Sequence, residues 1–501
     1  MNHVMKLGFN TFDSHALSAS PYFELPLEHG ADFVFCHTDP TAVSGFAGVE
    51  KAEKLGGVFQ ARGLDFIANF EFQNAAGSVI DNAGHEWCRT PDGAHRLNPN
   101  PDFIKALASR GNLLGVTYDE FDYALSTRNL STWYGSRRLR GEPVFPLTGD
   151  GSVLTQSRAV ETALKDYVNE IKAMGAPVFS GEHVFPILYH TFARCGMVPC
   201  CKAMKESASN LQFAVAAGAA LQYKTPLFSC VDLWHRQSFP GHSPEELKAN
   251  LEFAWLAGVD LAYVESDPVL VNRNALTPHG AVYTDFVKAY LGRPRAWHTA
   301  DYRPETGIIR FDDTYWGQNA FWDRGLFGNP RLRPGPRSRE WIRAVDIVTF
   351  GKSGKQSFNL NRIDGTLLKR HVSFMPANAL AVFDAYADKE ALSSLKLVFI
   401  TGVFVSPATM RAVAALVREN GLTAVCPPRF LPADVRLPQG SSFARVPDGK
   451  GTWIISTDPA SDKVRVAVKQ LLGRPDEIRL PFADRELRLR IADNGDGFTV
   501  Y

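Results

Sequence analysis

The sequence has no excess of either charge and no long apolar run. Its 501 residues contain 54 Lys and Arg against 53 Asp and Glu, which gives a formal net charge of +1. A chain so balanced has no overall field that would draw it to nucleic acid or to an anionic membrane. No stretch reaches the roughly eighteen continuous apolar residues of a membrane span. We therefore expect a neutral or weakly charged partner, not a polynucleotide or a bilayer.

The sequence also lacks a secretion signal and the cysteine spacing of a metal site. The start, MNHVMKLGFNTF, leads almost directly into a predicted strand, without an apolar signal core or a cleavage site. The seven cysteines are odd in number and scattered, and the one adjacent pair, Cys200 and Cys201, has no C-x-x-C or H-x-x-H pattern beside it. Reduced, buried thiols in a cytoplasmic protein are the expectation, unless a signal peptide has been removed.

Short apolar runs recur through the first three hundred residues, and longer segments of helical periodicity lie between them. The runs are MKLGFN, ADFVFC, LDFIANF, NLLGVTYD, APVFSGE, GMVPCC, TPLFSCVD and VDLAYVE. Eight strands that alternate with helices predict a (β/α)₈ TIM barrel over residues 1–300. GMVPCC is the weakest strand because it contains a proline. If it is not a barrel strand, GIIRFDD at 307–313 must supply the eighth.

Two helices between the strands have clear sequence signals. SRAVETALKDYVNEIKAMG has helical spacing, which predicts a buried face formed by Ala159, Ala163, Tyr167, Ile171 and Met174. HSPEELKANLEFAWLAG begins with Ser243 as a cap and Pro244 in the first turn, and ends at a glycine.

The composition changes after residue 300, where Pro, Gly and Arg become frequent. A strand at 396–401, a helix capped by Ser406 and ended by Gly421, and a further strand then predict a small flavodoxin-like α/β domain over 301–435. It has no G-x-G-x-x-G motif, so nothing indicates a dinucleotide. Short alternating runs such as TWIIST, EIRLPF and LRLRIAD predict an antiparallel β-domain over 436–501.

The candidate chemistry lies where the predicted strands end, because a barrel carries its active site at the carboxyl ends of its strands. In NLLGVTYDEFDYAL, Asp119 and Glu120 emerge directly from an apolar run. Other polar or aromatic side chains follow the third, fifth, seventh and eighth expected strands: Glu71, Glu182, His183, Asp232, Trp234, His235 and Glu265. The pattern predicts a ring of carboxylates with aromatic residues between them.

Such a ring fits the cleavage of a glycosidic bond. That reaction needs one carboxyl group to protonate the leaving oxygen and a second to attack the anomeric carbon or to activate water. Aromatic side chains, here Trp133 and Trp234, can stack on apolar sugar faces. Each acid could instead be a helix cap or an ion-pair partner. His183 and His235, with nearby acids, also leave open a metal-dependent barrel hydrolase or lyase.

The order of these features resembles the barrel glycoside hydrolases, in particular the family 42 β-galactosidases and related clan A-like enzymes. The resemblance rests on the acids after the fourth strand, a late strand that ends in Glu265, the segment LTPHGAVYTDFVKAYL, and the α/β and β units that follow. It covers most of the chain in domain order. The middle domain of that family supports a trimer, so the resemblance implies a homo-oligomer and a scaffolding role for residues 396–430.

The resemblance also implies site residues. In those retaining enzymes the acid/base is a Glu at the end of strand four, usually preceded by Asn, which corresponds to Glu120, here preceded by Asp119. Their nucleophile is a Glu at the end of strand seven. That residue is Glu265 if GMVPCC is not a barrel strand; otherwise strand seven ends at Asp232, and Glu182 is a further alternative.

The sequence thus predicts a retaining glycoside hydrolase that acts on a glycoside or oligosaccharide without metal or cofactor. Glu120 is expected to be the acid/base and Glu265 the carboxylate that attacks. Eight residues are expected to hold the sugar: Asp119, Glu182, His183, Asp232, Trp234, His235, Glu71 and Trp133. The alternatives are the metal-dependent barrel and a carbohydrate-binding barrel without catalysis.

Overall fold

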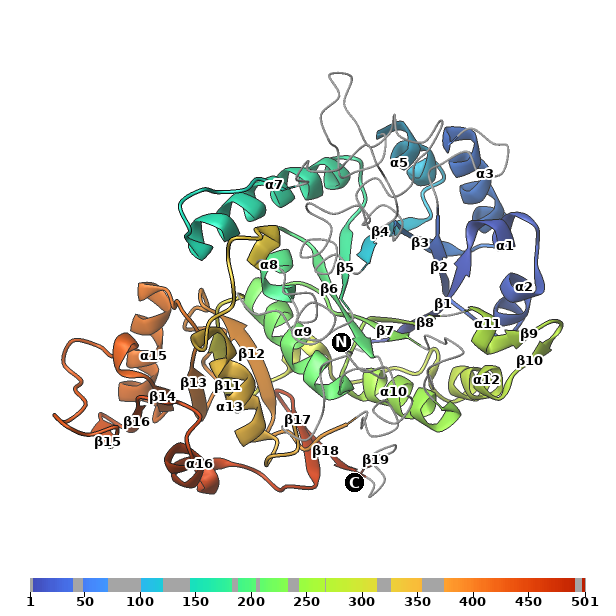
Figure 1. The fold of residues 1–501 in the computed structure, drawn as a ribbon. Helices are drawn as coiled ribbons and strands as arrows, with labels where there is room; N and C mark the ends of the chain where they lie inside the picture. The colour runs from blue at the N-terminus through green and yellow to red at the C-terminus, as the bar shows by residue number, and fades with distance from the viewer. Residues whose placement is uncertain are drawn as a thin grey trace.

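The structure, a computed structural model, describes residues 3–38, 48–70, 101–119, 145–182, 188–203, 208–232, 243–265, 267–312, 326–353, 374–491 and 498–500. Figure 1 shows a barrel, coloured blue to green, beside an α/β unit coloured orange, with a small sheet near the C-terminus. The barrel is closed and entirely parallel. Its strands are β1 (Lys6–Phe12), β2 (Phe33–His37), β3 (Asp65–Asn69), β4 (Leu113–Asp119), β5 (Val178–Glu182), β6 (Val198–Ala203), β7 (Phe228–Asp232) and β8 (Leu261–Glu265).

All eight predicted barrel strands are confirmed, including the proline-containing one. GMVPCC contributes to β6, which pairs in parallel with β5 and with β7. GIIRFDD is therefore not a barrel strand and forms β11 (Thr306–Arg310) of the next unit. The count also shows where the late acids lie, because strand seven ends at Asp232 and strand eight ends at Glu265.

Helices cover the outside of the barrel (Figure 1). The described ones are α1 (Asp13–Leu17), α2 (Pro21–Glu28), α3 (Gly48–Ala61), α5 (Pro101–Ala108), α7 (Val153–Ala173), α8 (Tyr189–Arg194), α9 (Ser209–Tyr223), α10 (Pro244–Leu256), α11 (Asp267–Leu270) and α12 (Pro278–Tyr290), with a short β9 (Val271–Asn272) and β10 (Ala275–Leu276) hairpin. The predicted cap of α10 is confirmed, since Ser243 and Glu246 form a capping box.

The predicted face of α7 is confirmed in part: Ile171 is buried, and Ala163, Tyr167 and Met174 pack against the core while partly buried. The buried apolar stripe consists of Val160, Leu164, Val168 and Ile171, whereas Ala159, Ala163, Tyr167 and Met174 are only partly buried. The physical reason is that the neighbouring stripe carries the larger branched side chains, which bury more apolar surface per residue than alanine does.

The α/β unit contains a six-stranded sheet in the order β12-β11-β13-β14-β16-β15. Five strands are parallel, β11, β12 (Leu380–Asp384), β13 (Leu397–Ile400), β14 (Thr423–Cys426) and β16 (Gly451–Ser456), and β15 (Phe443–Asp448) pairs antiparallel with β16. The parallel strands have the flavodoxin-like order 2-1-3-4-5. Helices α13 (Glu340–Val348), α15 (Pro407–Asn420) and α16 (Asp462–Val468) belong to this unit, and α15 is capped by Ser406 as predicted.

The sheet of the α/β unit continues past the boundary expected at residue 435. β15 and β16, which the sequence assigned to a separate β-domain, extend the sheet through the pairing of β14 with β16. The antiparallel sheet at the C-terminus contains β17 (Glu477–Pro481), β18 (Glu486–Ile491) and β19 (Phe498–Val500). Within the described ranges, no helix combines the length and the apolar character needed to cross a membrane.

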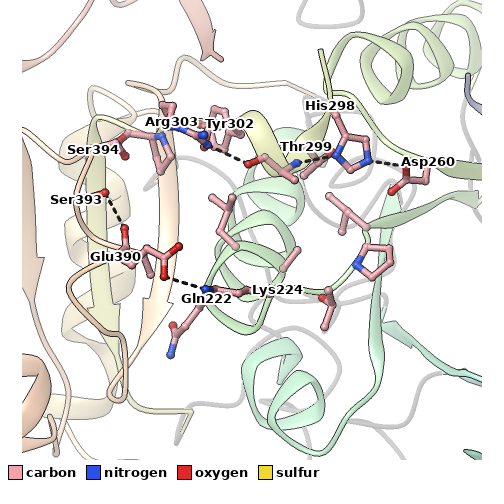
Figure 2. A pocket seen from close by; sticks show the side chains of 18 of the residues that line it. Gln222, Lys224, Asp260, His298, Thr299, Tyr302, Arg303, Glu390, Ser393 and Ser394 are labelled. Atoms are coloured by element: carbon pink, nitrogen blue, oxygen red, sulfur yellow. Dashed lines mark hydrogen bonds and ion pairs between the residues drawn. The ribbon is translucent and has the colours of Figure 1, made fainter. Parts of the chain in front are cut away.

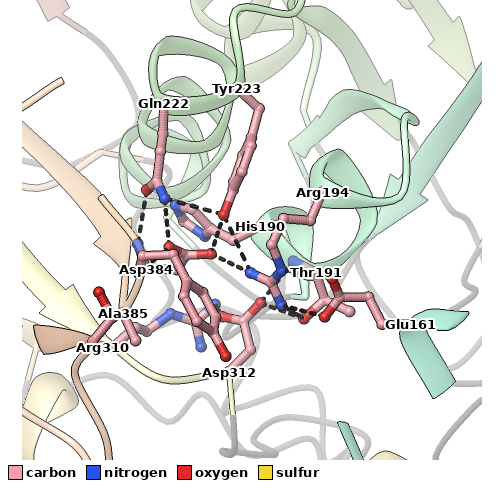
Figure 3. Close-up of polar contacts among 12 residues, drawn as sticks. Glu161, His190, Thr191, Arg194, Gln222, Tyr223, Arg310, Asp312, Asp384 and Ala385 are labelled. Atoms are coloured by element: carbon pink, nitrogen blue, oxygen red, sulfur yellow. Dashed lines mark hydrogen bonds and ion pairs between the residues drawn. The ribbon is translucent and has the colours of Figure 1, made fainter. Parts of the chain in front are cut away.

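The barrel and the α/β unit are joined by close packing between α9 and β12. Gly218 of α9 makes this approach possible, because a Cβ atom there would lie 1.7 Å from the Val382 carbonyl oxygen. A buried polar network surrounds the contact (Figure 3). Asp384, at the end of β12, accepts hydrogen bonds from Arg194, Gln222 and Tyr223 of the barrel helices.

The end of the neighbouring strand, β11, also contacts a barrel helix through a buried carboxylate. Asp312 follows β11, and its Oδ2 accepts from the Thr191 amide at 2.9 Å and from the Thr191 hydroxyl at 2.8 Å. Its other oxygen pairs with Arg310 at 2.7 Å. The carboxyl edge of the α/β sheet, where a flavodoxin-like fold would hold a ligand, is thus filled by contacts with the barrel at these two strands.

Candidate active site

The middle of the barrel interior is apolar, and polar side chains gather towards the carboxyl ends of the strands. Apolar side chains, most of them aromatic or sulfur-containing, fill the middle, namely Phe33, Phe35, Ile67, Phe179, Cys200, Phe228, Cys230 and Tyr263. Side chains alternate along a strand, so the residue two positions beyond an inward one also faces inward. This rule leads from Phe35 to His37, from Ile67 to Asn69, from Cys200 to Lys202, from Cys230 to Asp232 and from Tyr263 to Glu265. The apolar core therefore ends in a polar layer at the carboxyl ends of the strands.

Lys202 lies at the centre of this layer. Its Nζ is 3.0 Å from Asp119 Oδ1, 3.0 Å from Glu265 Oε2 and 3.4 Å from Asp232 Oδ2. The four side chains come from β6, β4, β8 and β7, and we call them the lysine cluster. Gly181 of β5 leaves room for it, because a Cβ there would lie 2.8 Å from Asp119 Oδ1. One ammonium group thus contacts three carboxyl groups.

A second group of side chains orients the cluster from β2 and β3. Asn69 donates from Nδ2 to Asp119 Oδ2 at 3.1 Å, and the same nitrogen lies 3.3 Å from His37 Nδ1. His37 Nε2 in turn lies 3.8 Å from Glu265 Oε1. His37 and Asn69 are buried. The layer is therefore a continuous polar network that runs from β2 round to β8.

The surroundings of Glu265 favour its protonated form. Burial raises the pKa of its carboxyl group from 4.5 to about 8, and the neighbouring Asp232 also raises it, whereas the Lys202 ammonium acts in the opposite direction. The thiol of Cys230 lies 3.2 Å and the hydroxyl of Tyr263 3.5 Å from Glu265 Oε2. With 14% of its side chain exposed, Glu265 is the most accessible member of the lysine cluster.

Lys202 remains charged although it is buried. Burial alone would lower the pKa of its ammonium, but Asp119, Glu265 and Asp232 together hold that pKa well above its ordinary value. The arrangement places Glu265, whose protonated form is favoured, beside the carboxyl groups of Asp119 and Asp232.

Three of the ten predicted site residues meet in the lysine cluster: Asp119, Asp232 and Glu265. Glu182 is the last residue of β5, but its side chain is outside the described part of the structure. The other six fall outside the described residues: Glu71, Glu120, Trp133, His183, Trp234 and His235. The sequence prediction overlooked Lys202, His37 and Asn69, which alternation along the strands could have identified.

Residues of the described ranges include no group of three or more His, Cys, Asp or Glu side chains that could hold a metal ion. In the lysine cluster, the Lys202 ammonium lies among the carboxylates where a divalent cation would otherwise bind. The donor set of this cluster therefore does not suit a metal.

A cavity of about 770 Å³ lies at the opposite end of the barrel (Figure 2). Its walls include residues just before β7 and β8, the segment at 298–304 and the connection between β12 and β13. Its polar side chains are largely paired with one another, as Lys224 is with Glu390 at 2.8 Å and His298 with Asp260 at 2.5 Å. The cavity is therefore remote from the lysine cluster, and the chemistry described here does not take place in it.

Comparisons with known proteins support this fold. No protein-family model and no curated protein sequence matches the chain. Among solved structures, a β-galactosidase from the haloarchaeon Halorubrum lacusprofundi is similar with a TM-score of 0.57 at 11% identity, over 97% of this chain and 93% of that one. An exo-β-1,4-mannosidase from Opitutaceae bacterium strain TAV5 is similar with a TM-score of 0.51 at 13% identity, over 93% and 94%. The barrel with its additional units is thus confirmed as the architecture of the chain, in agreement with the resemblance seen in the sequence.

Proposed function

We propose that the chain is a glycoside hydrolase and that the lysine cluster forms the floor of its active site. The observation that carries the proposal is the pairing of Asp232 and Glu265 at the carboxyl ends of adjacent barrel strands, where burial raises the pKa of Glu265. A proton donor next to an ionised carboxylate is the pair that glycosidic cleavage requires. The whole-chain likeness to a β-galactosidase and an exo-mannosidase supports a sugar as the substrate.

In this mechanism Glu265 donates its proton to the glycosidic oxygen. Its raised pKa favours this role over that of the attacking carboxylate that the sequence assigned to it. Asp232 ends the seventh strand, where the resemblance places the nucleophile, and its carboxylate would attack the anomeric carbon. Glu120 directly follows β4, and it remains the predicted acid/base in the alternative arrangement.

We further propose that the configuration of the sugar is retained. Asp232 and Glu265 are paired in register on neighbouring strands, which lie about 4.8 Å apart in a sheet. Retaining enzymes have carboxyl groups about 5 Å apart, whereas inverting enzymes need roughly 6.5 to 9.5 Å to accommodate a water molecule. The adjacent strands favour the shorter separation.

The test is hydrolysis of a panel of nitrophenyl glycosides and β-linked oligosaccharides. The proteins are the wild type, Glu265→Gln, Asp232→Asn, Glu120→Gln and, as a matched control, Glu390→Gln, which changes an exposed glutamate. We expect Glu265→Gln to lower kcat/KM about 10³-fold on a nitrophenyl glycoside and much less on a dinitrophenyl glycoside, whose leaving group needs no proton. Asp232→Asn should abolish cleavage of both, and the control should match the wild type.

The same panel separates the competing functions. A loss of activity with chelator would favour the metal-dependent barrel, and sugar binding without turnover by the wild type would favour the carbohydrate-binding barrel. In a different outcome, Glu120→Gln would lower kcat/KM more on the nitrophenyl than on the dinitrophenyl glycoside, and Glu265→Gln would cleave neither. The roles predicted from the sequence would then replace those proposed here. NMR analysis of the first sugar anomer released tests retention.

A further inference from the structure

Lys202 contacts as many carboxyl groups as it has N–H donors. An ammonium group has three donors and no acceptor, and here three carboxyl oxygens lie within 3.4 Å of it on three different strands. Only 1% of the side chain is exposed. Lys202 therefore has little surface with which to contact a substrate, and its contacts are with the acids themselves.

The three carboxyl groups differ in what else they contact. Asp119 accepts a hydrogen bond from Asn69 in addition to Lys202. Glu265 faces the neutral thiol of Cys230 and the phenol of Tyr263 as well as His37. The groups that face the cluster with a charge or a titratable proton are thus His37 on β2, Asp119 on β4, Cys200 and Lys202 on β6, Cys230 and Asp232 on β7, and Tyr263 on β8.

We infer that Lys202 is a positioning residue whose fixed ammonium holds the three carboxyl groups in place and offsets their negative charge. The ammonium is held by four strands of a closed barrel, so its charge cannot move away when the substrate binds or leaves. A fixed positive charge within about 4 to 6 Å favours the ionised form of a carboxyl group. Without it, three acids in a buried layer would repel one another.

The kinetic test of this inference rests on the proposed function. It predicts a shift in the pH dependence of kcat/KM when Lys202 is replaced. Lys202 lowers the pKa of Glu265, so its removal should raise that pKa and keep the acid protonated to higher pH. In Lys202→Met, we expect the alkaline limb of kcat/KM to move up by about one pH unit or more. Lys202→Arg, which keeps the charge, should retain the wild-type limb.

A matched control is available in Lys51, a second buried lysine, which pairs with Asp13 on the outside of the strands at 2.5 Å. Lys51→Met should lower the melting temperature without moving either limb of the pH profile. If Lys202→Met instead lowers the rate with both limbs unchanged, Lys202 has a merely structural role and the inference is wrong.

A second measurement does not depend on activity. The carboxyl carbons of ¹³C-labelled glutamate can be titrated by NMR in the wild type, Lys202→Met and Lys202→Arg, with Glu265→Gln to identify the signal. We expect the Glu265 signal to titrate near pH 8 in the wild type and at higher pH in Lys202→Met. An unshifted titration would overturn the inference, even if no glycoside is cleaved and the proposed function fails. If Lys202→Met does not fold, the comparison uses Lys202→Arg, and a shifted Glu265 titration there would contradict the inference.

Discussion

At the carboxyl end of the barrel three carboxyl groups share one ammonium, whereas at the carboxyl edge of the α/β sheet the acids contact several donors each. Asp384 accepts from Arg194, Gln222 and Tyr223. Although burial raises the pKa of Asp312, Arg310 and other cationic neighbours hold that pKa below its ordinary value. The pKa of Glu265 in the barrel is raised instead.

The number of donors around the acids distinguishes two roles of clustered carboxyl groups, one in the barrel and one in the α/β unit. Parallel strands bring polar side chains together at their carboxyl ends in both units. Where donors are sufficient, the charges are neutralised and the network joins two units of the fold. Where donors are too few, one acid keeps a proton that it can release, which is typical of functional sites. The difference therefore supports the proposed chemistry at the lysine cluster and indicates that the Asp384 network serves the assembly of the fold.

The largest expected effect on stability concerns the Asp384 network. Asp384→Ala would leave Gln222 and Tyr223 without this acceptor and remove the partner of Arg194 across the interface. Removal of one partner from a buried ion pair costs about 3 to 5 kcal/mol, and we expect a loss of about 3 kcal/mol in the free energy of unfolding, measured in urea. The rate per folded molecule should stay unchanged.

The control for this substitution is Glu390→Ala, which removes an exposed carboxylate in the same unit and should leave the unfolding curve unchanged. A large loss of the hydrolysis rate per folded molecule in Asp384→Ala would contradict this distinction between the two units. The Asp384 network would then contribute to the chemistry as well as to the fold.

Removal of the Glu265 acid should raise the free energy of unfolding, the opposite of the effect expected for Asp384→Ala. The reason is that an acid without sufficient compensating donors destabilises the fold when it ionises. Above about pH 4.5 the unfolded chain releases the proton that the folded chain retains up to about pH 8. The free energy of unfolding therefore falls as the pH rises between these values, and it becomes constant above them. Glu265→Gln resembles the protonated acid and avoids this cost.

We expect Glu265→Gln to be more stable than the wild type by up to a few kcal/mol at pH 8 and equally stable near pH 4.5, in urea unfolding at a series of pH values. Equal stability at pH 8 would show that Glu265 is not held protonated. Since the same variant should lose activity, greater stability with less activity would mark the lysine cluster as functional.

Much of the barrel could be predicted from the sequence because buried parallel strands are continuous apolar runs, and eight of them have the spacing of one closed sheet. Asp119, Asp232 and Glu265 were identified for the same reason. Lys202 was overlooked because GMVPCC was interpreted only through its pair of cysteines. Alternation along the strand, which makes Cys200 and Lys202 both face inward, would have identified it.

Other features depend on contacts that no local pattern indicates. β15 and β16 read as part of an independent antiparallel domain, and only their pairing with β14 reveals that they extend the α/β sheet. The network around Asp384 joins residues 161 to 190 positions apart in the sequence. Likewise, which acid of the lysine cluster keeps a proton follows from burial and from three-dimensional neighbours.

The smallest expected effect concerns the ion pair of Lys224 and Glu390, which spans the same two units at the cavity of Figure 2. Both side chains are largely exposed, so water and salt screen their attraction and side-chain entropy opposes it. Lys224→Ala, Glu390→Ala and the double variant should therefore have the same unfolding midpoint as the wild type at low and at high salt. A salt-dependent loss in both single variants and in the double variant, smaller in the double variant than the sum of the two single losses, would show that an exposed pair also holds the units together. If this midpoint is unchanged and Asp384→Ala is destabilised, the buried network, and not the exposed pair, joins the α/β unit to the barrel. The reason is that an unpaired charge is costly when it is buried.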